Sequence, residues 1–175
     1  MPEATAQGFR ITRLHVRCGR LDILTATPLA LLHVSEGTAQ RTLQLLPNLR
    51  NHVCVHTRAG GGTFGPELVG TELAHLFEHV VIELQAQAQC EAAAVAGGPQ
   101  FIGHTSWAEE LAVTGPQGHA LMRTTVTFAD DLVALQAAKD AAGLLNWACG
   151  PQVSAHAPDV AAIVGHLQDL DEPPK

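Results

Sequence analysis

One apolar segment, residues 70–89, constrains the fold more than any other part of the chain. It has no internal glycine or proline and is rich in Leu, Ala, Glu and Gln, which predicts a helix from 70 to about 89. Apolar residues surround this helix on nearly every side, so it should be buried: Leu73, Ala74, Leu76, Phe77, Val80, Val81, Ile82 and Leu84. The same helix carries two histidines and two glutamates, and a buried polar or charged group needs a partner.

A metal ion is the partner that the spacing of these residues favours. His75 and His79 are four residues apart, which places both on one face of the helix. With Glu78 they form an H-x-x-E-H motif, in which the glutamate lies beside the metal and accepts a proton from a metal-bound water. Zn²⁺ is the expected cofactor because it favours imidazole ligands, although iron or manganese could occupy the same site. A pair of surface histidines is the alternative, which the apolar surroundings disfavour.

A catalytic zinc site needs a third protein ligand and an open position. Residues 52–57 alternate as a strand would, so His52, Cys54 and His56 should share one face. We predict Cys54 as the third ligand, with Glu83, His52 and His56 as alternatives in that order. Glu83 lies about 12 Å along the axis from His75, so a role in orienting a ligand suits it better. A buried strand cysteine that binds no metal is the other interpretation of Cys54.

Two further segments supply candidate substrate contacts. The glycine-rich stretch AGGGTFGPE lies between the strand and the helix, and its Gly61 and Gly62 would allow a bound chain to approach the backbone closely. A flexible connector is an equally good interpretation. His104, in FIGHTSW, is a candidate substrate contact as well.

The remaining pattern indicates a single α+β domain, with a mixed sheet packed against helices. Strands are expected at 9–18, 29–34, 52–57 and 118–128, and helices at 35–46, 70–89, 129–145 and 158–170. A short strand could also form within residues 97–107. We expect the domain to span residues 1–170 and to be followed by a flexible tail at 171–175.

Charge and composition limit the classes of partner. The net charge is −7 with only 10 Lys and Arg, which argues against nucleic acid. We expect the densest basic group to form a solvent-exposed face of a strand, and its members are Arg10, Arg13, Arg17 and Arg20. Neither a secretory signal nor an apolar run of membrane-spanning length is recognisable, so we expect a cytoplasmic protein that does not bind membranes. The four cysteines form no CxxC pair and should be free thiols unless one binds metal.

Three stretches, LLPNLRNHVCV, GGGTF and VGTELAHLFEHVVIELQ, together resemble the N-terminal domain of cyanophycin synthetase. The resemblance runs from RITRLHV to ADDLVALQAAKDAAGLL and suggests a stand-alone homologue of that domain. It implies either a zinc hydrolase that cuts an Asp-Arg polymer into primers or a binding platform without the metal motif. The motif positions Cys54, His75, Glu78 and His79 are filled, which favours the hydrolase. The chain departs from the family pattern at His104, Ser106 and Thr127, where contacts to charged substrate groups would change.

The sequence therefore predicts a zinc-dependent hydrolase that cleaves a peptide or isopeptide-like amide bond. An Asp-Arg (cyanophycin-like) polymer is one candidate substrate, and Glu78 is the general base. The alternative is a non-catalytic polymer-binding module, or an accessory subunit, with a structural metal or none. A site closed by four protein ligands would favour that alternative. A peptide or amide-linked polymer is the expected partner, and a homo-oligomer is compatible with the sequence.

Overall fold

The computed structural model describes residues 8–54, 62–89, 101–108, 118–151 and 156–171. Its largest sheet has the strand order β1-β2-β6-β5. These strands are β1 (Arg10–Arg17), β2 (Arg20–Pro28), β6 (His119–Thr127) and β5 (Gly103–Trp107). The helices are α1 (Glu36–Leu45), α2 (Leu73–Gln89), α3 (Asp131–Cys149) and α4 (Val160–Asp171). The predicted α+β class is confirmed, but the described strands pair only antiparallel, whereas we expected a mixed sheet.

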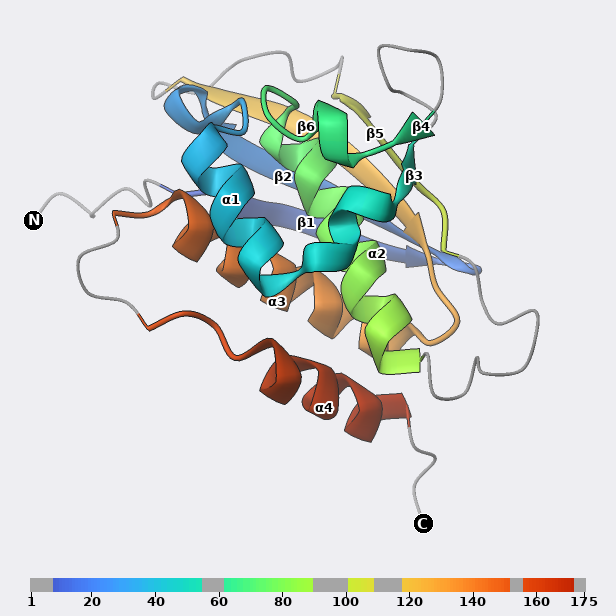
Figure 1. Ribbon diagram of the computed structural model, residues 1–175. Helices are drawn as coiled ribbons and strands as arrows, with labels where there is room; N and C mark the ends of the chain where they lie inside the picture. The colour runs from blue at the N-terminus through green and yellow to red at the C-terminus, as the bar shows by residue number, and fades with distance from the viewer. Residues whose placement is uncertain (1–7, 55–61, 90–100, 109–117, 152–155, 172–175) are drawn as a thin grey trace, which may run out of the picture.

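Helices cover one face of the sheet (Figure 1). Helix α2 contacts β5 and β6, and helix α3 contacts β1 and β2. Helix α4 packs against both α2 and α3, whereas α1 packs against α3. Strand β2 shows the resulting alternation, because Leu21 and Ile23 are fully buried whereas Asp22 and Leu24 are partly exposed. On the other face of the sheet, therefore, polar side chains are accessible.

Helix α2 is the central element of the core. It begins three residues later than predicted and ends at Gln89, as predicted. Thirteen of its 17 residues are buried, because α3, α4, β5 and β6 all pack against it. The predicted burial of this helix is thus confirmed, and its ionisable residues lie inside the protein.

The strand predicted at 29–34 is wrong. Residues Leu29–Leu31 form a short 3-10 helix, η1, and the preceding residues Arg20–Pro28 form β2 instead. The alternation of Leu21 and Ile23 with Asp22 suits a strand with one buried face, and Pro28 ends it. The apolar run that follows packs against the core without pairing, apart from one bridge between His33 and Glu72.

The strand predicted at 52–57 is represented by two residues in the described chain. Strand β3 (Val53–Cys54) pairs with β4 (Gly62–Thr63). Two further 3-10 helices flank this hairpin, η2 (Pro47–Asn51) and η3 (Gly65–Glu67). Among the described helices, none combines the length and the apolar character needed to cross a membrane.

Helix α3 provides a test of local stabilisation. Its N-cap is Asp130, whose carboxylate accepts a hydrogen bond of 2.9 Å from the backbone N–H of Val133. We expect Asp130→Ala to lower the free energy of unfolding by about 1 kcal/mol, because that N–H loses its partner. Urea denaturation measures the change. The matched control is Asp131→Ala in the same first turn, and an equal loss in the two variants would contradict the capping role.

Candidate metal centre

The three residues predicted as metal ligands lie together. Cys54 Sγ and one ring nitrogen each of His75 and His79 all lie within 4.8 Å of one another. Strand β3 supplies the cysteine, which is 4% exposed, and consecutive turns of α2 supply the histidines. Within the described residues no fourth histidine, cysteine or carboxylate joins this group. Among the described residues the group therefore offers three potential ligands, whereas a closed structural zinc site has four.

A chain of hydrogen bonds fixes how His79 is oriented. Its Nδ1 lies 3.1 Å from Nδ1 of His52, and Nε2 of His52 lies 2.7 Å from Oε2 of Glu83. The carboxylate can only accept, so His52 donates from Nε2 and accepts at Nδ1 from the Nδ1–H of His79. This assignment leaves a lone pair on Nε2 of His79. That atom is buried and has no hydrogen-bond partner among the described residues, as expected of a nitrogen placed to bind a metal.

His75 is oriented by a residue one helical turn earlier. Its Nδ1 lies 2.9 Å from Oγ1 of Thr71, and its Nε2 lies 3.4 Å from Sγ of Cys54. When Nδ1–H donates to Thr71, Nε2 turns its lone pair towards the cysteine. Two imidazole nitrogens and one thiol sulfur then converge, a donor set that suits Zn²⁺.

Burial keeps His79 in the neutral form that metal binding requires. Removal from water, together with the nearby His75 and His52, lowers the pKa of His79 to about 3. The ring of Phe64 stacks on His79 at a centroid distance of 3.8 Å, which helps to exclude water. An imidazole whose Nε2 carries no proton has a lone pair there, so it can bind a cation without releasing a proton first.

Glu78 lies next to this group without being part of it. Its side chain is buried between α2 and β5, where the hydroxyl of Thr105 donates a 2.6 Å hydrogen bond to Oε2. Burial raises the pKa of Glu78 to about 7, and the hydrogen bond from Thr105 opposes the increase. Gly103 permits this packing, because a Cβ atom there would collide with the carboxyl group. A carboxyl group with a pKa near neutrality can both accept and donate a proton.

Glu83 lies behind His52 rather than in the ligand group. Burial alone would raise the pKa of Glu83, but hydrogen bonds from His52 and Gln87 outweigh it, so the pKa lies below its usual value. The carboxylate is therefore ionised at neutral pH and holds His52 in the tautomer described above. Glu83, two turns beyond His75 on α2, thus contacts His52 and is not a member of the ligand group, and its orienting role stays a prediction.

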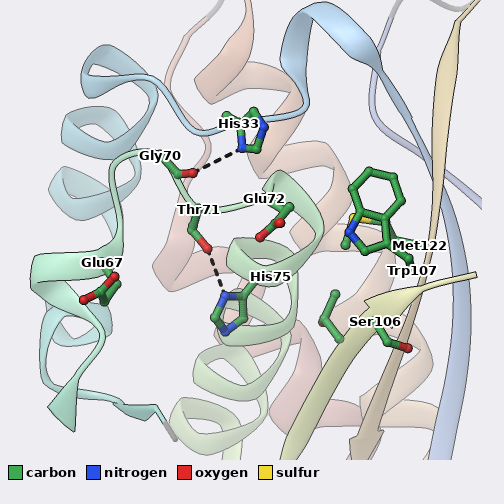
Figure 2. A pocket seen from close by; sticks show the side chains of 10 residues that line it. His33, Glu67, Gly70, Thr71, Glu72, His75, Ser106, Trp107 and Met122 are labelled. Atoms are coloured by element: carbon green, nitrogen blue, oxygen red, sulfur yellow. Dashed lines mark hydrogen bonds between the residues drawn. The ribbon is translucent and has the colours of Figure 1, made fainter. Parts of the chain in front are cut away.

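A pocket of about 410 Å³ opens against His75 (Figure 2). Figure 2 shows Glu67, Glu72 and Trp107 around the same opening, with His75 at its lower end. Thr105, which holds Glu78, also lines this pocket. The pocket thus connects the candidate metal centre with two carboxylates and an indole ring.

The remaining residues that we predicted for the site do not all lie near the ligand group. Gly62 pairs with Cys54 in the β3–β4 hairpin, whereas Gly61 and His56 lie outside the described residues. His104 is exposed on β5, and because its neighbours Gly103 and Thr105 face Glu78, it points to the opposite face of the sheet. The structure therefore does not bring His104 to the pocket.

Sequence reasoning missed two residues that hold the site together. Thr71 could have been found, because it precedes His75 by four residues within the segment predicted to be helical, although α2 itself begins at Leu73. Thr105 could not, because the sequence gives no indication that β5 packs against Glu78.

We expect Glu83→Gln to weaken zinc binding by about ten- to a hundredfold, because the amide holds the His52 ring less firmly than the carboxylate. Competition against a chromophoric chelator measures the affinity without any assay of activity. Glu36→Gln, the same change in an exposed first-turn residue of α1, is the matched control. Equal zinc affinity in Glu83→Gln and the wild type would contradict the orienting role.

One known protein family matches the part of the chain that contains these residues. Residues 29–98 match the model of the cyanophycin synthase-like N-terminal domain, and this stretch contains Cys54, His75, Glu78, His79 and Glu83. No curated protein sequence matches the chain. The resemblance predicted from the motifs is thus confirmed over the part of the chain that carries the candidate metal centre. Over residues 29–98 the chain is similar to the cyanophycin synthase-like N-terminal domain.

Proposed function

We propose that this protein is a zinc-dependent hydrolase that cleaves a peptide or isopeptide-like amide bond. The observation that carries the proposal is the three-membered group of Cys54, His75 and His79, in which the buried Nε2 of His79 has no hydrogen-bond partner among the described residues. Glu78 directly precedes His79 on the same helix, and the hydroxyl of Thr105 holds its carboxyl group. Three ligands together with a buried carboxyl group are the minimum that metal-assisted hydrolysis requires.

Zinc bound at this site would supply a Lewis acid for the scissile carbonyl and would lower the pKa of water. Residues of the chain would carry out the proton transfers. Glu78 accepts a proton from the attacking water and later donates it to the leaving amine, for which a pKa of about 7 is well placed. Thr105 holds the carboxyl group in position while this exchange takes place.

The pocket beside His75 supports a substrate with a positively charged group. Glu67 and Glu72 contribute carboxylates, and the indole of Trp107 can bind a guanidinium or ammonium group through its face. An Asp-Arg polymer of the cyanophycin type carries guanidinium groups beside amide bonds that link side chain to backbone. We therefore propose such a polymer, or a peptide with basic side chains, as the substrate.

The first test measures metal content and hydrolysis together. Purified wild-type protein should contain about one zinc ion per chain, and Cys54→Ala and His79→Ala should lose it. Glu78→Gln should retain zinc but lose about a hundred- to ten-thousandfold in kcat on an Asp-Arg polymer or on basic peptides. Its matched control is Glu36→Gln, which should retain activity.

Other outcomes of that test would change the proposal. Zinc retained in Cys54→Ala would move the third ligand to another residue. Wild-type protein that binds zinc but cleaves neither the polymer nor basic peptides would favour a polymer-binding module with a structural ion. Protein that stays metal-free after reconstitution with zinc would exclude the hydrolase.

The pocket itself gives a separate prediction about specificity. Glu72→Gln removes one carboxylate from the pocket, so KM for a basic substrate should rise about three- to thirtyfold, the equivalent of one charged hydrogen bond of moderate strength. The kinetics should be compared on peptides that differ only in arginine or citrulline at the same position. An equal effect on both peptides would show that Glu72 does not recognise the charge.

A further inference from the structure

Basic residues gather on the sheet face opposite the helices, although the chain as a whole is acidic. Five of the ten Lys and Arg residues lie on three adjacent strands: Arg10, Arg13, Arg17, Arg20 and Arg123. In Figure 1 the described helices lie on the other side of this sheet. The sequence-based interpretation of this group as a merely solvated face did not include Arg123, which follows it by about a hundred residues.

The strand register places two of these arginines in one row. Arg13 pairs with Leu24, and Leu24 pairs with Arg123, so the two arginines flank Leu24 on the same face. Their Cα atoms are two strand spacings apart, about 10 Å. Long side chains at this separation can bring their guanidinium groups together above Leu24, whose side chain supports their aliphatic stems.

Asp22 neutralises the neighbouring arginines but not these two. Its carboxylate lies 2.6 Å from Nε of Arg17 and 3.6 Å from Nε of Arg20, and it also accepts a hydrogen bond from Thr125. Among the described residues, no carboxylate forms an ion pair with Arg13 or Arg123. Two positive charges in one row are therefore left for an external anion.

A cavity of about 210 Å³ lies at this place, lined by Arg13, His15, Arg17, Asp22, Leu24 and Arg123 among others. Edge protection explains charged residues on β1, because β1 is an outer strand of the sheet. It does not explain Arg123, because β6 is an inner strand. The described face also lacks Phe and Trp rings on which bases could stack, and the cavity is small, both of which disfavour a nucleic acid.

We propose that this face holds a second ligand site, in which Arg13 and Arg123 together bind a small oxyanion with two or more negative charges. Each guanidinium offers a planar pair of N–H donors to a carboxylate or a phosphate group. His15 and Arg17 border the cavity and contribute further donors. The site lies across the sheet from the candidate metal centre and does not depend on the hydrolase proposal.

Isothermal titration of the full chain at low ionic strength tests this site with two probes that chelate metal weakly. Glycerol 2-phosphate represents phosphate esters and tricarballylate represents polycarboxylates. We expect at least one probe to bind, and Arg13→Gln and Arg123→Gln each to weaken that binding about ten- to a hundredfold. Lys139→Gln, which removes the same charge from the exposed surface of α3, is the matched control and should bind as the wild type does.

Each result of this titration bears on the proposal. Binding of only one probe would identify the source of the oxyanion and support the site. Binding that persists in Cys54→Ser would show that the oxyanion site is separate from the metal centre. Loss of binding in that variant would overturn the assignment. The absence of binding by both probes at millimolar concentration would also overturn it, as would equal weakening by Lys139→Gln. Tighter binding of a single-stranded oligonucleotide, lost in the same arginine variants, would replace it with a nucleic-acid surface.

Discussion

Burial of helix α2 is the constraint on which the rest of the structure depends. The helix is enclosed by α3, α4 and two strands, yet it carries His79, Glu78 and Glu83 into that interior. A polar group in such a place is costly unless it has a partner. The partners come from two other parts of the chain: Thr105 for Glu78, and His52 for both Glu83 and His79. The site is thus a consequence of packing a polar motif into a core.

The same hydrogen bonds assign different tasks to chemically similar residues. Glu78 and Glu83 are both buried carboxyl groups on α2, five residues apart. Burial dominates at Glu78 and raises its pKa, whereas hydrogen bonds dominate at Glu83 and lower its pKa. One carboxyl group is therefore suited to exchange protons, and the other to hold a charge permanently. The difference arises from the residues that contact each carboxyl group: Thr105 of β5 at Glu78, and His52, which follows η2, together with Gln87 of α2 itself at Glu83.

The sequence predicted the relative positions of residues within one helix better than the contacts between different helices and strands. The spacing of His75, Glu78 and His79 settles their relative positions, because an α-helix has a fixed period. Cys54 could also be predicted, because the alternation of side chains along a strand places it on the same face as His52. The role of Thr105, the position of His104 away from the pocket and the row formed by Arg13 and Arg123 all depend on which strands are neighbours. Strand order follows from long-range packing, which local patterns do not encode. The omission of β2 has a different cause, because its residues alternate locally as a strand does, and we predicted a strand in the apolar run at 29–34 instead.

The ligand group also has a consequence for the folding of the chain. Cys54 and His75 are 21 residues apart and belong to different elements, a two-residue strand and a long helix. A cation held by both would close a loop of that length through coordination bonds, much as a disulfide closes one covalently, and would restrict the unfolded chain. The β3–β4 hairpin, for which the described residues contribute two pairs, would then be attached to the core by coordination. Metal supply in the cell would in this way set how firmly one wall of the site is held.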